Sequence, residues 1–346
     1  MKKLVLPLVA VALLAVFALA ALEWYKDNRL PGFTGSASLY VYPETTSDEV
    51  LAFLDEKGVV ADSRRLARVF KSKRVGEYLT PGYYFVNKDN SCVYVARMLN
   101  NGWESPVNLT LSGTIRSCGD IARKIGNQVL TDSASVHDCL ADKAFLADLG
   151  YTPQNILSMF IPDTYQTYWT LSAKEIILRL KKATDSFWDE EKLKAASSVG
   201  LSRQEVSVLA SIVTAESNYS PELPKIAGVY LNRLKMGMPL QADPTVAFCF
   251  DYKPERILNK HLEVDSPYNT YKYAGLPPGP ICVPSKEALL AVLNPDYGGG
   301  NLYFCANPDF SGTHVFARTL SQHNANARAF QAELSRRHRA KRNSSL

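Results

Sequence analysis

The chain has 346 residues, of which 46% are hydrophobic and 21% are charged, and its formal net charge is +5 at pH 7. This length allows two or more domains, and the balanced composition is typical of a globular protein and excludes a low-complexity chain. The mild positive charge suits an anionic surface nearby without requiring one. The basic tail at 336–342 comes with no nucleic-acid-binding motif, so we interpret it as a solvated helix end and expect no nucleic-acid partner.

The first predicted element is a membrane span. Two lysines at 2–3 precede nineteen residues without a charge, 4–22. A helix rises about 1.5 Å per residue, so this run nearly crosses a hydrocarbon core of roughly 30 Å, and the lysines indicate a cytoplasmic N-terminus. Residues 18–20 also resemble a signal-peptide cleavage site, which leaves a cleaved leader as the alternative. We expect a retained anchor over 1–25 and a linker over 26–36.

The next region alternates extended runs with short capped helices, which indicates small α+β modules. Each predicted helix start has Ser or Thr as its cap, followed by aliphatic residues at helical spacing. The caps are Thr46, Ser91 and Ser117, and the extended runs before them are 38–42, 82–86 and 107–111.

From about Thr170 the pattern becomes mainly helical. Predicted helices cover 173–186, 189–197 and the segments around Glu216, and Ser285 caps a further helix that ends at 293. Proline- and glycine-rich loops over 238–284 would close one end of this bundle, and 302–305 with 314–316 form a short hairpin. The fold class is therefore α+β, with a mainly helical second half.

Glu216 occupies a position where a helix of this kind normally carries an apolar residue. A capping box, Ser202 and Glu205, starts the helix, and its apolar stripe is Val206, Leu209, Ala210 and Val213. Glu216 is the next position on that stripe, three residues after Val213. A carboxyl group on a core-facing stripe has a raised pKa, as a general acid for sugar chemistry requires. The alternative is that the stripe ends at Val213 and Glu216 is solvated.

Loop-forming motifs follow this helix. Asn218-Tyr-Ser-Pro221 ends it and starts a second helix, which runs to about Met236 and stops at Gly237. The second helix carries Ile226, Val229, Tyr230 and Leu234 inward. The stretch 238–246 is predicted to be irregular and rich in polar groups. Taken singly, each of these motifs is also compatible with an ordinary turn.

Together these stretches resemble the YceG-like endolytic murein transglycosylases over nearly the whole chain, in matching order and spacing. The motifs that carry the resemblance are Phe160-Ile-Pro-Asp-Thr-Tyr165, Ala-Ser-Ile-Val-Thr-Ala-Glu216-Ser, Val-Tyr-Leu-Asn-Arg233-Leu, Gly-Met-Pro-Leu-Gln-Ala-Asp243-Pro-Thr-Val, Tyr268-Asn-Thr-Tyr271, Gly275-Leu-Pro-Pro-Gly-Pro-Ile281, Gly312-Thr-His-Val-Phe316 and Gln322-His-Asn324. Two positions depart from the family pattern. The usual Glu-x-Glu-Ser/Thr run is Thr214-Ala-Glu216-Ser here, and Asn-Pro-Gly is replaced by Val283-Pro-Ser285.

The resemblance implies a fold, a reaction and a catalytic residue. It implies a LysM-like α+β region over 37–165 that holds glycan strands, and a lytic transglycosylase domain over 166–346. Glu216 aligns with the catalytic glutamate of the family. It would act as general acid and then as general base, cleaving the MurNAc–GlcNAc bond within nascent strands and leaving 1,6-anhydro-MurNAc ends that terminate elongation. No metal and no cofactor are required.

The expected substrate-binding residues are polar and aromatic groups from the loops. Amide and hydroxyl side chains would bind sugar hydroxyls, and tyrosines would stack on pyranose faces. The set is Asn232, Gln241, Asp243, Thr245, Tyr268, Asn269 and Tyr271. Asp243 is better explained as a turn former that caps backbone N–H groups than as a second catalytic carboxylate. Arg233 either pairs with Asp243 or contacts substrate.

Two other function classes stay open on the sequence alone. One is a membrane-anchored, peptidoglycan-binding scaffold without catalysis. The other is a plain hydrolase in which Asp243 or Glu222 positions water. Expected partners are peptidoglycan strands, the cytoplasmic membrane and peptidoglycan synthases. The bulk of the chain is expected outside the cytoplasm. The six cysteines include no Cys-x-x-Cys pair, so we expect no zinc site. Disulfide bonds and buried free thiols stay open as alternatives.

Overall fold

The computed structural model describes residues 2–344 and contains two compact units. Unit 1 comprises the residues up to 109 together with 128–131 and 166–172, and unit 2 comprises 110–127, 132–165 and the rest of the chain from 173. Most of the segment 110–165 therefore belongs with the helical part of the chain, whereas the predicted domain boundary lay at 165–166. A hydrogen bond of 2.8 Å from Val283 N to Ile115 O ties this segment to the loops of unit 2.

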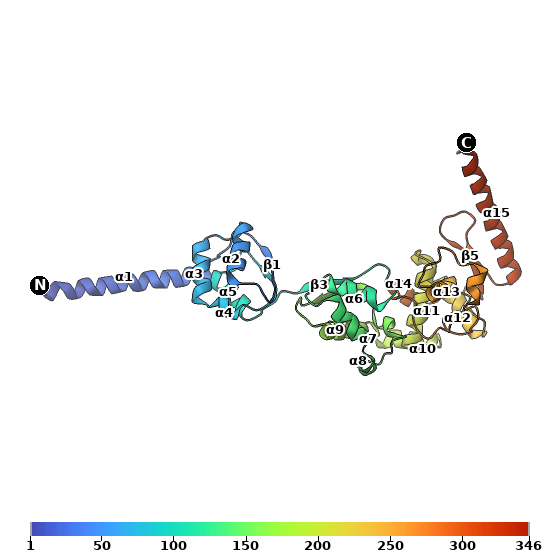
Figure 1. The fold of residues 1–346 in the computed structure, drawn as a ribbon, viewed down its shortest axis with the longest axis horizontal. Coiled ribbons are helices and arrows are strands. Elements are labelled where there is room, and N and C mark those ends of the chain that lie inside the picture. The colour runs from blue at the N-terminus through green and yellow to red at the C-terminus, as the bar shows by residue number, and fades with distance from the viewer. Residues whose placement is uncertain (1, 345–346) are drawn as a thin grey trace. The chain divides into compact units, whose positions relative to one another are not determined.

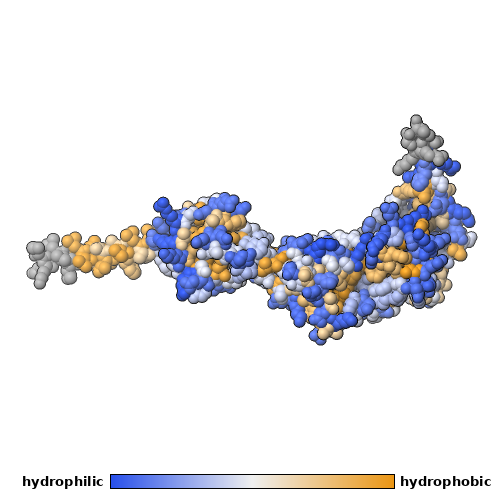
Figure 2. Space-filling model, in the orientation of Figure 1, coloured by the Kyte–Doolittle hydropathy of each residue, from blue (hydrophilic) through white to orange (hydrophobic). Residues whose placement is uncertain are grey.

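Helix α1 (Lys2–Arg29) is the predicted apolar helix. Its part from Leu8 to Arg29 is long and apolar enough to cross a membrane, and none of that part is buried within the protein. Figure 2 shows a hydrophobic surface along this helix. The helix continues four residues beyond the predicted anchor, and Phe33 in the predicted linker is buried in the core of unit 1. Residues 26–36 are thus part of a folded unit.

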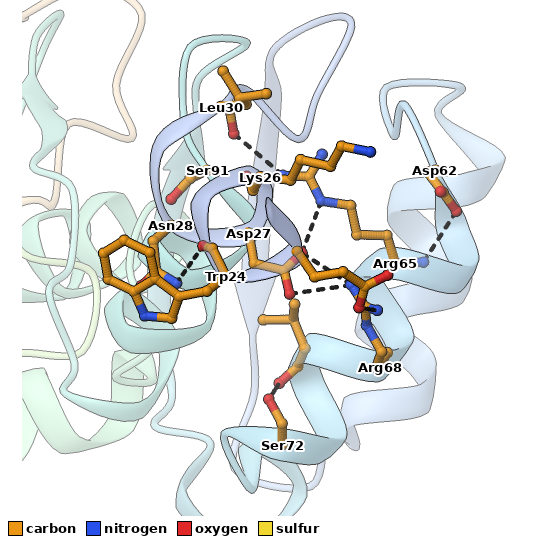
Figure 3. Close-up of polar contacts among 12 residues, drawn as sticks. Trp24, Lys26, Asp27, Asn28, Leu30, Asp62, Arg65, Arg68, Ser72 and Ser91 are labelled. Carbon is orange, nitrogen blue, oxygen red and sulfur yellow. Dashed lines mark hydrogen bonds and ion pairs between the residues drawn. The ribbon is translucent and has the colours of Figure 1, made fainter. Parts of the chain in front are cut away.

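The C-terminal end of α1 is fastened to helix α3 (Ser63–Ser72) by ion pairs, as Figure 3 shows. Arg65 Nε lies 3.0 Å from Asp27 Oδ1, and Arg68 contacts both Asp27 and Glu23. Arg65 also donates to the backbone carbonyl of Lys26. Asp27 and Arg65 are 15% and 14% exposed, so this network is shielded from water more than an ordinary surface ion pair is. The C-terminal end of the apolar helix is therefore held against unit 1 by polar contacts.

The rest of unit 1 is a two-stranded antiparallel sheet with short helices packed on it (Figure 1). Leu39 pairs with Tyr84 across the sheet, and both are buried. The capping residues Thr46 and Ser91 accept hydrogen bonds from the first turns of their helices, as predicted. The elements are β1 (Ala37–Val41), α2 (Ser47–Glu56), α4 (Val75–Tyr78), β2 (Gly82–Val86) and α5 (Cys92–Asn100). The α+β prediction is confirmed here, and the LysM-like assignment stays a prediction.

Several short elements follow the first sheet in the chain. Strands β3 (Val107–Leu111) and β4 (Asp163–Thr167) form a second two-stranded sheet. Ser117 caps the next helix, as predicted, and forms a capping box with Asp120. The helices of this part are α6 (Cys118–Gly126), α7 (Ser133–Ala141), α8 (Lys143–Asp148) and the 3₁₀ helix η1 (Ile156–Met159).

The core of unit 2 is built from amphipathic helices, which confirms the mainly helical prediction. Val206, Leu209, Ile226, Tyr230 and Val292 are among its buried residues. The elements are α9 (Ala173–Phe187), α10 (Glu190–Ser198), α11 (Arg203–Glu216), η2 (Ser220–Glu222), α12 (Leu223–Lys235), α13 (Asp243–Cys249), η3 (Asn259–Glu263), α14 (Lys286–Leu293), β5 (Tyr303–Ala306), β6 (His314–Ala317) and α15 (Leu320–Ser344).

Three further predictions can be compared with the structure. The predicted hairpin is present, with β5 antiparallel to β6. The stretch 238–246 was predicted to be irregular, but helix α13 begins within it at Asp243.

All six cysteines are free thiols, so the disulfide alternative does not hold in this structure.

Candidate active site

Glu216 is the last residue of α11, and it continues the apolar stripe as predicted. Ser202 and Glu205 form the expected capping box at the start of the helix. Val206, Leu209, Ala210 and Val213 are all fully buried. The backbone becomes extended at Ser217, so α11 ends with its carboxylate at the edge of the core. The alternative of a freely solvated Glu216 is wrong, because the side chain is half-buried and lines two cavities.

The surroundings of Glu216 favour its protonated form. The pKa of Glu216 is raised to about 7. Burial is the main cause of this rise, the hydrogen bond from Tyr230 opposes it, and the negative charge of Asp243 adds to it. The Tyr230 hydroxyl donates to Glu216 Oε1 at 2.6 Å. Tyr230 lies on α12, is 2% exposed and packs edge-on against Phe304. The carboxyl group is therefore oriented by a rigid phenol and is ready to give or take a proton near neutral pH.

Two cavities of unit 2 share Glu216 and Asp243 as lining residues. The smaller has a volume of about 380 Å³. The larger has a volume of about 790 Å³. Side chains that line the smaller cavity include Tyr230, Arg233, Gln241, Tyr271, Tyr303 and His323. The larger cavity is lined by residues such as Arg116, Asn218, Tyr252, Arg256 and Cys282. A ligand in either cavity therefore reaches the same pair of carboxylates.

Asp243 does not play the capping role predicted for it. It is the first residue of α13. The N-cap position before it is occupied by Ala242, and no side chain caps this helix. The Asp243 carboxylate instead accepts a hydrogen bond of 2.6 Å from the Tyr271 hydroxyl. Asp243 is exposed, whereas Glu216 is half-buried. The two carboxylates thus differ in exposure and in hydrogen-bond partner.

Arg233 holds the loops around the smaller cavity, and the predicted pair with Asp243 is wrong. Its guanidinium donates to Leu302 O at 2.6 Å and to Leu240 O at 2.8 Å, and it also bonds Gln241 Oε1 at 3.2 Å. Arg233 is 7% exposed. No ion pair joins it to an acidic side chain in the described part of the chain. Backbone carbonyls accept the hydrogen bonds of this buried guanidinium. Without these bonds, both the guanidinium and the carbonyls would be buried polar groups without partners.

Gln241 lines the smaller cavity in a strained backbone conformation. Its φ is +53°, a left-handed value that non-glycine residues rarely adopt. The backbone N–H of Gln241 donates to Thr270 O at 3.0 Å, and Arg233 holds its side-chain oxygen. Such strain persists only where neighbouring contacts fix it, and it is common at functional sites.

Four of the predicted substrate-binding residues lie outside both cavities. The Thr245 hydroxyl is fully buried and bonds Ala242 O and Thr270. The Asn269 amide donates to Leu262 O and Val264 O, and the Asn232 amide donates to Tyr297 O and Asn301 O. Tyr268 packs against Phe248 with ring centroids 4.5 Å apart. These side chains shape the loops, while Gln241, Asp243 and Tyr271 of the same set line the cavities.

Several cavity residues were not predicted as site residues. Tyr230 was predicted only as a core residue of the second helix. His323 was treated as structural, but its ring lines the smaller cavity and stacks on Tyr303. Its Nδ1 is buried and has no hydrogen-bond partner among the described residues, and burial together with the charge of Arg233 lowers the pKa of His323. The histidine is therefore neutral at neutral pH.

Glu222, the other carboxylate weighed for water positioning, lies elsewhere. It accepts two hydrogen bonds from His314 N, at 3.0 and 3.1 Å, and its Oε2 lies 3.0 Å from His314 Nδ1. Glu222 lines neither of the two cavities. Its contacts fasten α12 to the hairpin.

Comparisons with known proteins agree with this architecture. The model of the YceG-like family matches residues 39–329. A protein of Bacillus subtilis (strain 168) named endolytic murein transglycosylase is 28% identical over 307 residues, covering 82% of this chain and 81% of the relative. A Streptococcus pneumoniae serotype 2 (strain D39) protein of the same name is 26% identical, and the match covers 92% of this chain and 63% of that relative. The crystal structure of a putative yceG-like protein, lmo1499, from Listeria monocytogenes matches with a TM-score of 0.54 and 27% identity, over 84% of this chain and 98% of that one.

Proposed function

The chain belongs to the YceG-like family, and we propose its function from this family and from Glu216, a half-buried carboxyl group that lines two cavities. It is a lytic transglycosylase that cuts peptidoglycan strands internally. The observation that carries this proposal is the environment of Glu216, with a pKa raised to about 7 and a hydrogen bond from Tyr230.

The chemistry needs one group that first gives and then takes a proton. Protonated Glu216 donates its proton to the glycosidic oxygen between MurNAc and GlcNAc, and the bond to C1 of MurNAc breaks. The resulting carboxylate then removes the proton of the C6 hydroxyl of the same MurNAc, whose oxygen closes on C1. The products are a 1,6-anhydro-MurNAc end and a free GlcNAc hydroxyl, and Glu216 is again protonated. A pKa near 7 makes both steps accessible at neutral pH.

Asp243 supports this cycle electrostatically. Its negative charge raises the pKa of Glu216, which keeps the acid protonated before cleavage. The same charge stabilises the positive charge that develops at C1 in the transition state. Tyr271 holds the Asp243 carboxylate in place through the 2.6 Å hydrogen bond. Asp243 therefore contributes to the rate without transferring a proton itself.

The two cavities account for cutting within a strand. A glycan that occupies both cavities would have sugars on either side of the scissile bond, and that bond would lie at Glu216 and Asp243, which line both cavities. An enzyme that acted only on strand ends would need one side closed. In this proposal Gln241, Tyr271 and the Tyr303–His323 stack bind sugar in the smaller cavity.

The same proposal places the site outside the cytoplasm. Helix α1 anchors the chain in the cytoplasmic membrane, and its ion-paired junction with α3 holds unit 1 to that anchor. Unit 1 and the adjoining α+β elements act as LysM-like modules that hold glycan strands, and peptidoglycan synthases are the expected partners. N-terminal sequencing of the mature protein tests the anchor, since a start at Ala21 would indicate cleavage.

Product analysis tests the function. The purified full-length chain is incubated in detergent with polymeric peptidoglycan, and the products are separated and weighed by mass spectrometry. We expect anhydro ends and an early fall in strand length, and almost no anhydro product from Glu216→Gln. Reducing ends would favour the hydrolase. The absence of cleavage by a folded, glycan-binding protein would favour the scaffold.

A further inference from the structure

The larger cavity contains an arginine whose charge no described acidic side chain neutralises. Arg116 lines this cavity together with Glu216, and it is exposed. Its backbone N–H donates to Asp120 at 2.9 Å, but its guanidinium forms no ion pair among the described residues. Arg233 of the smaller cavity differs, since backbone carbonyls occupy its guanidinium. Arg116 therefore has donors to offer a ligand.

The Arg116 side chain rests on a fixed aromatic ring. Its guanidinium carbon lies 3.9 Å from the centroid of Tyr252. The Tyr252 hydroxyl donates to Ile281 O at 2.6 Å, and its backbone N–H donates to Ala247 O at 2.8 Å. The residue before Arg116, Ile115, is held by Val283 N. Stacking on an aromatic face leaves the edge of a guanidinium open, so a planar anion can bind it with two parallel hydrogen bonds.

The charges of the larger cavity are divided. Its acidic lining residues are Glu216, Asp243 and Glu255, whereas its basic lining residues are Arg116 and Arg256. A neutral sugar gains little from an unpaired guanidinium, but a carboxylate gains a charge-assisted pair of hydrogen bonds. The planar geometry and the open donors of Arg116 therefore favour a carboxylate as ligand.

We propose that Arg116 binds a carboxylate of the stem peptide that the muramyl sugar carries, so that the enzyme prefers peptide-bearing strands with free carboxylates. This inference rests on the proposed function, in which a MurNAc unit lies against Glu216. The stem peptide is joined to the lactyl group of that same sugar and carries carboxylates. A volume of about 790 Å³ accommodates the first residues of such a peptide beside the sugar.

The test compares three substrates and four full-length proteins in detergent. The substrates are strands with intact stem peptides, the same strands with their peptide carboxylates converted to amides, and strands stripped of peptides by an amidase. The proteins are the wild type, Arg116→Gln, Arg116→Lys and Lys225→Gln. Lys225 is exposed on α12 and lines neither cavity, so Lys225→Gln removes the same charge from unit 2 without changing the site.

We expect the wild type to show a kcat/KM about tenfold higher on the intact strands than on the amidated strands, which corresponds to ~1.4 kcal/mol. This ratio falls to about one in Arg116→Gln, stays above one in Arg116→Lys, and is that of the wild type in Lys225→Gln. Arg116→Gln with an unchanged ratio overturns the inference. An equal loss on all three substrates also overturns it, because Arg116 would then only shape the Tyr252 loop.

A binding measurement separates this inference from the proposed function. The Glu216→Gln chain is titrated calorimetrically with N-acetylmuramyl-L-alanyl-D-glutamate and with its diamide. Tighter binding of the free acid, lost when Arg116→Gln is added, supports carboxylate recognition even if the wild type forms no anhydro ends. Equal affinity for the two compounds rejects the inference, whatever the products of cleavage are.

Discussion

Replacing Glu216 by glutamine should stabilise the protein at higher pH while it removes the activity. Glutamine has the size of glutamate and keeps an oxygen that can accept the Tyr230 hydrogen bond, but it cannot ionise. In the wild type, burial raises the pKa of Glu216 from 4.5 to about 7. Between these values the folded protein binds more protons than the unfolded chain, so its free energy of unfolding falls as pH rises. In Glu216→Gln the free energy of unfolding lacks this dependence on pH, because glutamine does not ionise.

The magnitude follows from that pKa. At about 1.36 kcal/mol for each pH unit, the rise sets an upper limit of about 3 kcal/mol for the cost of ionising Glu216 in the folded state. Because the side chain is partly open to the cavities, we expect a smaller gain, about 1–2 kcal/mol. The free energy of unfolding of Glu216→Gln minus that of the wild type should therefore increase by this amount between about pH 4.5 and about pH 8, then stay constant.

Denaturant unfolding of both proteins across this pH range measures the difference. Glu287→Gln is the matched control, since Glu287 is exposed on α14 and lines neither cavity. The control should show no comparable gain. If the difference in free energy of unfolding between Glu216→Gln and the wild type does not change with pH, then burial does not destabilise the ionised carboxylate and the reasoning is wrong.

Four further outcomes follow from the site and the anchor junction. The wild-type kcat/KM should fall as pH rises above about 7, because the first step needs protonated Glu216; a rate that rises there would contradict the acid role. Tyr230→Phe removes the hydrogen bond that lowers the pKa of Glu216, so the falling limb of that profile should move to higher pH and the rate should drop about tenfold. Asp243→Asn should cost less turnover than Glu216→Gln and should move the limb to lower pH; equal losses of turnover would point to a second catalytic carboxylate. Asp27→Asn should loosen the end of α1 from α3, which limited trypsin digestion after Lys26 or Arg29 would detect as faster cleavage than in the wild type.

The parts of the fold that depend on local pattern were predictable from the sequence. Capping residues such as Ser202 and Ser285 locate helix starts, because the side chain satisfies backbone N–H groups within one turn. The 3.6-residue period predicts Glu216 as the next position of the apolar stripe, although the period alone is also compatible with a stripe that ends at Val213. These signals act over a few residues, so no knowledge of the rest of the chain is required.

The site beyond Glu216 depends on contacts that the sequence does not display. Asp243 was predicted to cap backbone groups, but Tyr271, which lies 28 residues later, supplies its hydrogen bond. Arg233 bonds Leu302 O, which lies 69 residues away. His323 reaches the smaller cavity from the start of α15. Polar loop residues such as Asn269 and Thr245 resemble ligand-binding groups in sequence, yet buried carbonyls and hydroxyls use their hydrogen-bonding capacity.

The central claim is that Glu216 cleaves the glycan without water as a reactant. Digestion of peptidoglycan in ¹⁸O-labelled water tests it most directly, with mass spectrometry of the new MurNAc ends. We expect the wild type to form anhydro ends that carry no ¹⁸O, and we expect Glu216→Gln to form at least about 10²-fold fewer of them. New reducing ends labelled with ¹⁸O, or anhydro ends formed at the wild-type rate by Glu216→Gln, would contradict it.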